Sequence, residues 1–360
     1  MSTTKLLIQP GTGVGSLIEG IDRAKEVIHI VIFRFDRGDI EMALKRAARR
    51  GVFVHALVAH TTTGQGGEKM LRKLEMRLLA DGITVGRTAT DLVRYHDKLM
   101  IIDKTWLYML GFNYTYLDTE RSRCFGIVTD HAEWVAEAEK LFYADTTRQI
   151  YEPGSDGFVV SPGNSRSQLM AMLSSAKKQL LIYDGKLSDP EMMRILAAKV
   201  RAGVDVRVIG ATGKRAVGVK VARLYMRLHA QAIVKDGEQL FLGSQSLRSL
   251  ELDARREVGL IVDDAEIAGQ VMQTFEADWE KSYGAQKSPP HIPDVPELEP
   301  ELDFSLPSLS PAISAQIVKS AVKEAIKDAI LETLQMSSEV IPFKEAVRDA
   351  AKEALVELAV

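Results

Sequence analysis

The sequence contains one cysteine, Cys124, in 360 residues. A single thiol excludes an intrachain disulfide and a cysteine-rich metal site. The sequence also lacks an unbroken apolar run of about 18 residues, which a membrane-spanning helix requires. Its N-terminus lacks the charged and apolar segments of a secretory leader. We therefore expect a cytoplasmic protein, and peripheral contact with a membrane stays open.

Neither sign of charge is in large excess, since 46 Lys and Arg face 49 Asp and Glu. Residues 284–360 carry 7 basic against 13 acidic side chains, so the preceding residues carry 39 against 36. This mildly positive body tolerates an anionic substrate. It has no polybasic tract of the kind that binds nucleic acid or anionic membranes tightly, so nucleic acid is the less expected partner.

Apolar periodicity near the N-terminus predicts a β-α-β-α-β run. The expected strands cover residues 5–9, 27–33 and 52–59, and the expected helices cover residues 16–24 and 40–50. Strands that alternate with helices favour a mainly parallel sheet between helical layers. Gly11, Gly13 and Gly15 lack the spacing of a nucleotide-binding loop, so we interpret them as a turn and expect no cofactor.

The same run recurs later in the chain. Pro10-Gly11, Ala24-Lys25, Gly51-Val52 and Val54 match Pro162-Gly163, Ala176-Lys177, Gly203-Val204 and Val206 at a constant offset of 152. His96, Asp103, Gly126, Asp130, Phe142 and Asp145 match His229, Asp236, Gly259, Asp263, Phe275 and Asp278 at an offset of 133. The smaller second offset indicates an insertion in the first copy, around residues 61–88, which includes an amphipathic helix. Two similar halves predict one pseudo-twofold body in which His96 and His229 meet.

Each half contains a histidine with a second polar side chain two residues later. The first copy is His96-Asp97-Lys98 and the second is His229-Ala230-Gln231. On a strand, positions i and i+2 face the same side. An imidazole and an ammonium that project together suit phosphate chemistry, because the imidazole attacks phosphorus or moves a proton while the cation neutralises oxygen.

The His-x-Lys-x4-Asp spacing, repeated with Gly111-Phe112-Asn113 or Gly243-Ser244 behind it, resembles the phospholipase D superfamily. The resemblance covers roughly residues 6–279. It implies an α/β fold of two phospholipase D-like β-α-β-α-β repeats, with mixed, mainly parallel sheets that pack as a pseudo-twofold unit. We place the first repeat at residues 1–150 and the second at residues 151–283.

The resemblance also implies a mechanism without a metal or other cofactor. His96 attacks a phosphodiester to form a phosphohistidine and His229 protonates the leaving alcohol, although exchanged roles stay open. Lys98 binds the phosphate. Asp103 and Asp236 complete the motifs, and we interpret them mainly as structural residues because a carboxylate at a turn accepts backbone N–H bonds. The implied substrate-binding positions are Asn113, Gln231, Ser244, Ser246 and Glu257.

The chain departs from the superfamily pattern at two positions. Gln231 replaces the second lysine and so removes one positive charge from the phosphate site. Cys124 stands where the first half usually has a carboxylate that orients the catalytic histidine, whereas the second half keeps Glu257. Asp118 and Glu120 are the two candidates to replace the missing acid.

Seven prolines from Pro289 to Pro311 mark an acidic linker, which we place at residues 284–312. Residues 313–360 then carry two amphipathic segments that predict a helical tail. Two helices cannot bury their apolar stripes alone. We therefore expect self-association or a protein partner through this tail, with membrane contact less favoured because its polar faces mix both signs of charge.

The second motif continues as Gly243-Ser244-Gln245-Ser246-Leu247-Arg248-Ser249, followed by Glu257-Val258-Gly259, which is similar to bacterial cardiolipin synthases and phosphatidylserine synthases. This branch implies a phosphodiesterase or phosphatidyltransferase with a phospholipid substrate. Two other functions stay open. One is a superfamily nuclease on DNA or RNA. The other is a degenerate binding module, in which Gln231 and Cys124 mark lost chemistry.

Overall fold

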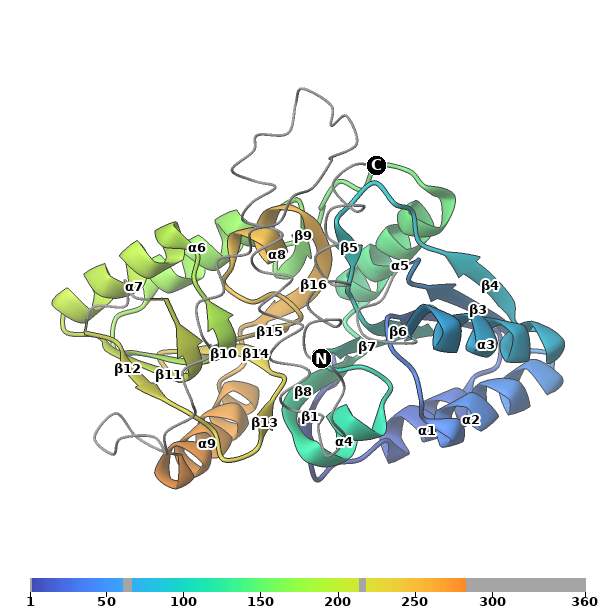
Figure 1. The fold of residues 1–360 in the computed structure, drawn as a ribbon, viewed down its shortest axis with the longest axis horizontal. Helices are drawn as coiled ribbons and strands as arrows, with labels where there is room; N and C mark the ends of the chain where they lie inside the picture. The colour runs from blue at the N-terminus through green and yellow to red at the C-terminus, as the bar shows by residue number, and fades with distance from the viewer. Residues whose placement is uncertain (1, 61–66, 214–217, 283–360) are drawn as a thin grey trace, which may run out of the picture. The chain divides into compact units, whose positions relative to one another are not determined.

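The computed structural model describes residues 2–60, 67–213 and 218–282 (Figure 1). The predicted linker and helical tail, residues 284–360, lie outside the described residues. Elements of the first repeat are β1 (Thr4–Gln9), α1 (Gly15–Arg23), β2 (Val27–Ile32), α2 (Gly38–Arg49), β3 (Phe53–Val58), α3 (Gly67–Ala80), β4 (Thr84–Arg87), β5 (Arg94–Tyr95), β6 (Leu99–Ile102), β7 (Trp106–Leu110), α4 (Tyr116–Arg121), β8 (Ser122–Thr129) and α5 (Ala132–Thr147).

The second repeat follows the same order with a shorter middle section. Its elements are β9 (Phe158–Ser161), α6 (Ser165–Ser175), β10 (Gln179–Leu187), α7 (Pro190–Arg201), β11 (Asp205–Thr212), β12 (Lys220–Ala222), β13 (Arg227–Leu228), β14 (Gln231–Lys235), β15 (Gln239–Gly243), α8 (Ser249–Asp253), β16 (Arg255–Val262) and α9 (Ala265–Lys281). The two repeats and the α/β class are therefore as predicted. Helix α3, which has no counterpart in the second repeat, lies in the expected insertion and buries Leu71, Leu74 and Leu78.

The predicted β-α-β-α-β run is confirmed to within two residues at every boundary. Helix α2 shows why the pattern works, since Ile40, Leu44 and Ala47 recur at helical spacing and are all fully buried. The helix stops before Gly51, whose φ of +90° lies in the left-handed region that favours glycine.

The described strands form two eight-stranded mixed sheets with matching order. The first runs β1-β8-β7-β6-β2-β3-β4 and the second runs β12-β11-β10-β14-β15-β16-β5, with β9 beside β16. Parallel pairing within a repeat is confined to β2-β3-β4 and β10-β11-β12. The parallel share is thus smaller than we predicted, because the motif strands return through short turns, such as the one between β6 and β7, and short turns join antiparallel neighbours.

Each sheet includes one short strand from the other repeat. Strand β5 pairs in parallel with β16, and β13 pairs in parallel with β8 and completes the first sheet. The residue after each short strand is a motif histidine, and it adds one more hydrogen bond to the other repeat. The His96 N–H donates to Arg256 O at 2.8 Å, and the His229 N–H donates to Arg123 O at 3.0 Å. Both motif histidines are therefore fixed to the opposite repeat through their backbones.

Two buried ion pairs cross between the repeats in the same symmetric way. Arg123 contacts Asp278 at 2.6 and 2.9 Å, and Arg256 contacts Asp145 at 2.9 and 3.0 Å. The backbones also approach closely, because a Cβ on Gly111 would lie 3.0 Å from Gly243 O. A Cβ at this position would also lie 2.9 Å from Phe125 O, so close backbone contacts within the first repeat and with the second repeat both require the glycine behind the first motif.

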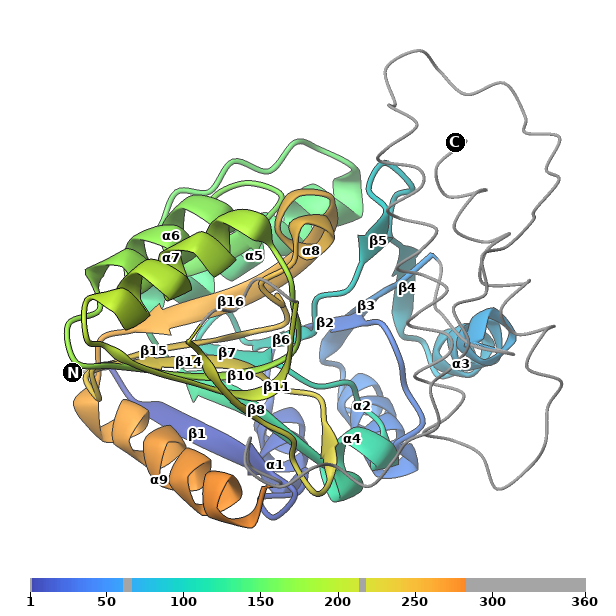
Figure 2. The ribbon, with the colours of Figure 1, turned by 60° about the vertical axis from the view of Figure 1, so that its left-hand side comes forward.

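Helices cover both outer faces of the paired sheets. Helices α1, α2 and α3 share one apolar core with the first sheet, and α6 and α7 share another with the second sheet (Figures 1 and 2). A third core lies between the sheets and includes residues of α5 and α9. Helix α9 contacts β1 of one sheet and β14 and β15 of the other, so it helps to join the repeats.

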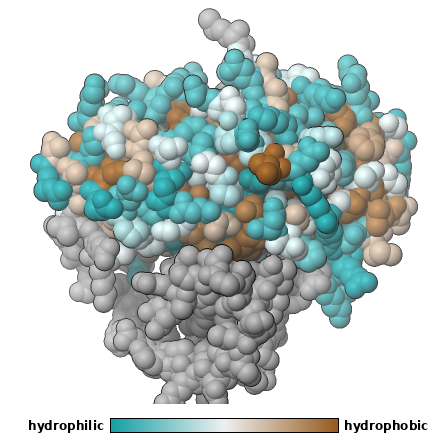
Figure 3. Space-filling view, turned by 90° about the horizontal axis from the view of Figure 1, so that it is seen from above, coloured by the Kyte–Doolittle hydropathy of each residue, from teal (hydrophilic) through white to brown (hydrophobic). Residues whose placement is uncertain are grey.

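In the described part of the chain, no helix combines the length and the apolar composition needed to cross a bilayer. The face drawn in Figure 3 is mainly hydrophilic, and its apolar residues occur in small separate groups.

Candidate active site

His96 and Lys98 project together from the segment between β5 and β6, as the alternation of side chains predicts. The Lys98 ammonium lies 3.0 Å from His96 Nε2 and 3.1 Å from Nδ1. Lys98 is only 1% exposed, and burial lowers its pKa to about 8. The charge that faces the imidazole is therefore held in a largely water-free position, where it acts on a bound anion more strongly than in solvent.

Glu257 comes from β16 of the other repeat and contacts His96 Nδ1 at 2.9 and 3.1 Å. Its carboxyl group is fully buried and also hydrogen-bonds with the Ser244 side chain. Burial raises the pKa of Glu257 to about 8, whereas burial and the Lys98 charge lower the pKa of His96 well below its usual value. His96 is therefore neutral at pH 7, with its Nδ1 side held by Glu257.

His229 lies in a different environment made by α4 and the segment before it. His229 Nε2 is 3.4 Å from Asp118 Oδ2 and 3.4 Å from Asn113 Nδ2, and its Nδ1 is 3.5 Å from Arg227 Nη2. Burial lowers the pKa of His229 to about 3, although the Asp118 carboxylate acts in the opposite direction. Burial acts to raise the pKa of Asp118, but protonated His229, the Arg227 charge and hydrogen bonds from Asn113 and Arg227 outweigh it and lower that pKa to about 2, so Asp118 is ionised at neutral pH.

The two histidines belong to one electrostatic site. The Lys98 charge lowers the pKa of both His96 and His229, and His229 itself contributes to the shift of His96. Each imidazole keeps some access, with side chains 17% and 18% exposed, respectively. The structure thus places the first-motif pair, Glu257 and the second-motif histidine around a common centre.

Four arginines add positive charge to this centre, and our sequence analysis did not identify them. Arg94 and Arg255 act on His96, and Arg34 and Arg227 act on His229. Alternate side chains of a strand face the same side, which is why His96 and Lys98 project together. Arg94 and Arg227 stand two residues before His96 and His229, so the same rule predicts that they face the site too. The site therefore keeps ample positive charge even though Gln231 replaces a lysine.

The remaining second-repeat candidates take different positions. Gln231 begins β14 and is half-buried. The Ser244 hydroxyl accepts from the Val258 N–H at 3.1 Å and is linked to His96 through Glu257. Ser246 is 1% exposed, and its side chain hydrogen-bonds with Asp184 instead of a histidine. Asn113 thus contacts His229 directly, whereas its counterpart Ser246 faces a buried carboxyl group.

Asp103 and Asp236 lie at the far ends of β6 and β14 from the histidines. The Asp103 carboxylate accepts the backbone N–H groups of residues 25–27, and the Asp236 carboxylate accepts those of residues 177–179. Both residues have positive φ, at 50° and 56°. The structure thus places these two motif members at turns that connect strands and away from the imidazoles.

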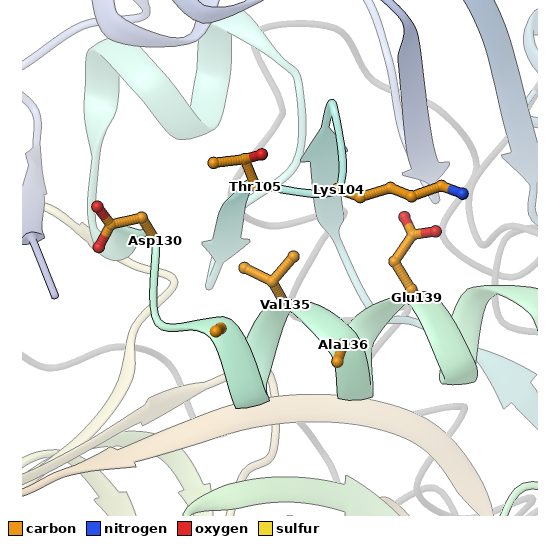
Figure 4. Close-up of a pocket in the computed structure, with 7 residues that line it drawn as sticks. Lys104, Thr105, Asp130, Val135, Ala136 and Glu139 are labelled. Carbon is orange, nitrogen blue, oxygen red and sulfur yellow. The ribbon is translucent and has the colours of Figure 1, made fainter.

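Two hollows on the outside of the described residues involve neither histidine. One, of about 470 Å³, lies between the β6–β7 turn and α5 and is lined by residues that include Lys104, Thr105 and Glu139 (Figure 4). Another, of about 810 Å³, is lined by residues that include His131, Trp134 and Lys235. Among residues 2–60, 67–213 and 218–282, no group of three or more His, Cys, Asp or Glu side chains is arranged to hold a metal ion.

Known proteins are similar to this chain in sequence or in fold. The chain is 22% identical to cardiolipin synthase 1 of Bacillus anthracis, over 78% of this chain and 67% of that protein. The fold is similar to that of a polyphosphate kinase from Porphyromonas gingivalis, with a TM-score of 0.65 and 16% identity, over 77% of this chain but only 47% of the kinase. It is also similar to phosphatidylserine synthase of Haemophilus influenzae, with a TM-score of 0.58 and 11% identity, over 78% and 87% of the two chains.

The family model described as "Cardiolipin synthase, PLD-like domain" matches residues 17–146 and 169–279, one segment in each repeat. These two segments together span more than half of the chain and include both histidine motifs. The chain therefore belongs to the phospholipase D-like domain family of the cardiolipin synthases.

Proposed function

We propose that the protein cleaves or exchanges phosphodiester bonds of a phospholipid through a phosphohistidine intermediate. The observation that carries the proposal is that His96 contacts both Lys98 and Glu257, which come from different repeats, and that His229 lies within electrostatic range of His96 and Lys98. A phosphodiester has one negative charge and a poor alkoxide leaving group. It therefore requires a nucleophile, a cation and an acid in the same site.

His96 is the proposed nucleophile. An imidazole attacks phosphorus only when it is neutral, and burial together with Lys98, Arg255 and Arg94 keeps the pKa of His96 low. Glu257 contacts Nδ1, which leaves Nε2 for the attack, and the ionised form of Glu257 stabilises the imidazolium cation that results. The N–P bond forms as the bond from phosphorus to the leaving oxygen breaks, and Lys98 neutralises the charge on the non-bridging oxygens.

His229 is the proposed general acid. It must carry a proton that passes to the leaving alkoxide, whereas burial holds its pKa at about 3. A bound phosphodiester anion raises this pKa by adding negative charge, and Asp118 already acts in that direction. Water or a second alcohol then gives its proton to His229 and attacks phosphorus, which breaks the N–P bond and restores His96.

The experiment compares three labelled substrates: phosphatidylcholine vesicles, phosphatidylglycerol vesicles and single-stranded DNA. The purified full chain and its His96→Ala variant are incubated with each substrate, with and without glycerol as a second alcohol. We expect the protein to release choline or glycerol from lipid and the variant to lose this activity. New phosphatidyl esters in the presence of glycerol indicate transfer, and their absence indicates hydrolysis.

The other outcomes overturn the proposal. DNA cleavage that the variant lacks would identify a nuclease. Lack of turnover on all three substrates, in a protein that still binds tungstate as a phosphate analogue at His96, would identify a binding module. Peripheral contact with a membrane follows from the lipid assignment, and co-sedimentation with the same vesicles tests it.

A further inference from the structure

The two histidines occupy equivalent corners of the pseudo-twofold body, but their acids come from different elements. In the corner of His96, the acid is Glu257, one residue after Arg256, whose carbonyl accepts the His96 N–H. In the corner of His229, the carbonyl of Arg123 accepts the histidine N–H, and the next residue is Cys124. The strand position that orients one histidine therefore carries a thiol at the other.

Cys124 does not supply a negative charge to His229. It is fully buried, and burial raises the pKa of its thiol well above the usual value. Its Sγ donates to Asp118 O at 3.1 Å, so the thiol faces helix α4. The backbone of this corner is intact, but the acid that the equivalent strand position supplies to His96 is missing here.

The Asp118 carboxylate lies in that corner and is fixed on several sides. It accepts the Asn113 N–H and the Asn113 Nδ2–H at 2.8 Å each, and Arg227 Nη1 donates to its other oxygen at 2.6 Å. Asp118 is only 2% exposed, and its Oδ2 is 3.4 Å from His229 Nε2. A contact of this length in the free protein shortens when the imidazole gains a proton.

The other acids nearby already have partners of their own. Glu251 is the counterpart of Asp118 at the offset of 133, and it likewise accepts the N–H of the residue at the Asn113 position, Ser246, at 2.7 Å. Its carboxylate pairs with Arg248 and Arg255 at 2.9 and 3.2 Å. Glu120, the second candidate for the missing acid, is half-exposed and pairs with Arg37 at 2.6 Å.

We propose that Asp118 is the positioning residue for His229 and performs from helix α4 the task that Glu257 performs for His96 from strand β16. This inference deepens the proposed function. It assigns one acid to each histidine, from the strand in one corner and from the helix in the other. Asp118 faces the His229 ring at Nε2, whereas Glu257 faces the His96 ring at Nδ1, and Asp118 stabilises the protonated form that the reaction requires.

The test measures the pKa of the His229 imidazole directly, by NMR of protein with labelled histidine, with and without tungstate. We expect Asp118→Asn to lower this pKa by at least one pH unit and Glu120→Gln to leave it unchanged. With substrate, Asp118→Asn should lower kcat by about 100-fold, the lower range for a positioned acid, with little change in KM. Because the NMR measurement needs no turnover, a protein without phosphodiesterase activity still tests this inference.

A second variant pair covers the case in which Asp118→Asn leaves Arg227 unpaired and does not fold. The double variant Asp118→Asn/Arg227→Gln has no unpaired buried charge at this position, and Arg227→Gln is its reference. We expect a lower His229 pKa in the double variant than in the reference. Equal His229 pKa values within either pair of proteins would overturn the proposal.

Discussion

Glu257→Gln gives the sharpest test of the proposed catalytic centre, because it removes a titratable group and leaves the shape of the side chain nearly unchanged. Burial raises the pKa of Glu257 from its usual 4.5 to about 8. Between these values the folded protein holds a proton that the unfolded chain has lost, so the free energy of unfolding falls as pH rises. At about 1.4 kcal/mol per pH unit, the loss from pH 4.5 to 8 is at most about 5 kcal/mol.

Glutamine does not titrate, so the variant should lose this pH dependence. We expect urea unfolding to show Glu257→Gln more stable relative to the natural protein at pH 8 than at pH 5, by about 2 kcal/mol or more. Although the variant gains stability relative to the natural protein as pH rises, we expect it to lose activity. At pH 8, where part of Glu257 is ionised, cleavage of bis(4-nitrophenyl) phosphate should fall by about 100-fold or more, because an amide cannot ionise to stabilise the His96 cation.

The control is Glu238→Gln, which removes a carboxylate that is 69% exposed and pairs with Lys178 on the surface. It should leave both the unfolding profile and the activity unchanged. The reasoning is refuted if Glu257→Gln keeps its activity, or if its unfolding free energy follows that of the natural protein in parallel from pH 5 to pH 8.

Three further predictions concern the interface, the turns and the histidines. Asp278→Asn and Asp145→Asn should each lower the unfolding free energy by about 3–5 kcal/mol, because each leaves a buried arginine unpaired; unequal losses in urea unfolding would show that the crossed pairs are not equivalent. Asp103→Asn should lower the free energy of unfolding by about 1–3 kcal/mol, because it weakens the hydrogen bonds from the backbone N–H groups, and should leave kcat within about twofold. A large loss of kcat in a fully stable variant would give Asp103 a catalytic role. The pKa of His229 is about 3 instead of its usual 6.5, so stability should fall as pH drops through this range, and His229→Gln should reduce that slope by up to about 1.4 kcal/mol per pH unit in urea unfolding.

The repeats were predictable because they depend on local signals of adequate length. Helix α2 has twelve residues and a buried stripe from Ile40 to Ala47, so its periodicity is visible in the sequence alone. The two constant sequence offsets then allowed the elements of the second half to be predicted from those of the first. The two-residue strands β5 and β13 have no such periodicity. Their exchange between sheets was therefore not predictable, although it fixes both histidines to the opposite repeat.

Part of the site was predictable for the same reason. Because side chains at positions i and i+2 of a strand face the same side, His96 and Lys98 were predicted to project together. The same rule applied two residues before each histidine predicts that Arg94 and Arg227 also face the site. It gave no choice between Asp118 and Glu120, which are two residues apart on the six-residue helix α4. That choice depends on which carboxylate meets Arg37 and which meets Arg227 and His229, and all of these partners are far from α4 in the sequence.

The crossed contacts also explain how two halves of one site diverged without losing the fold. Each histidine is fixed to the other repeat by a backbone hydrogen bond, and each crossed arginine pair is the same in both corners. These contacts join the repeats, so a change in either arginine or its partner is costly in both halves. Cys124 and Gln231 lie outside them. Their positions tolerate substitution as long as another charge, from Asp118 or from the arginines, acts on the same histidine. As a result, His96 lies beside Lys98, whereas His229 lies beside Asp118.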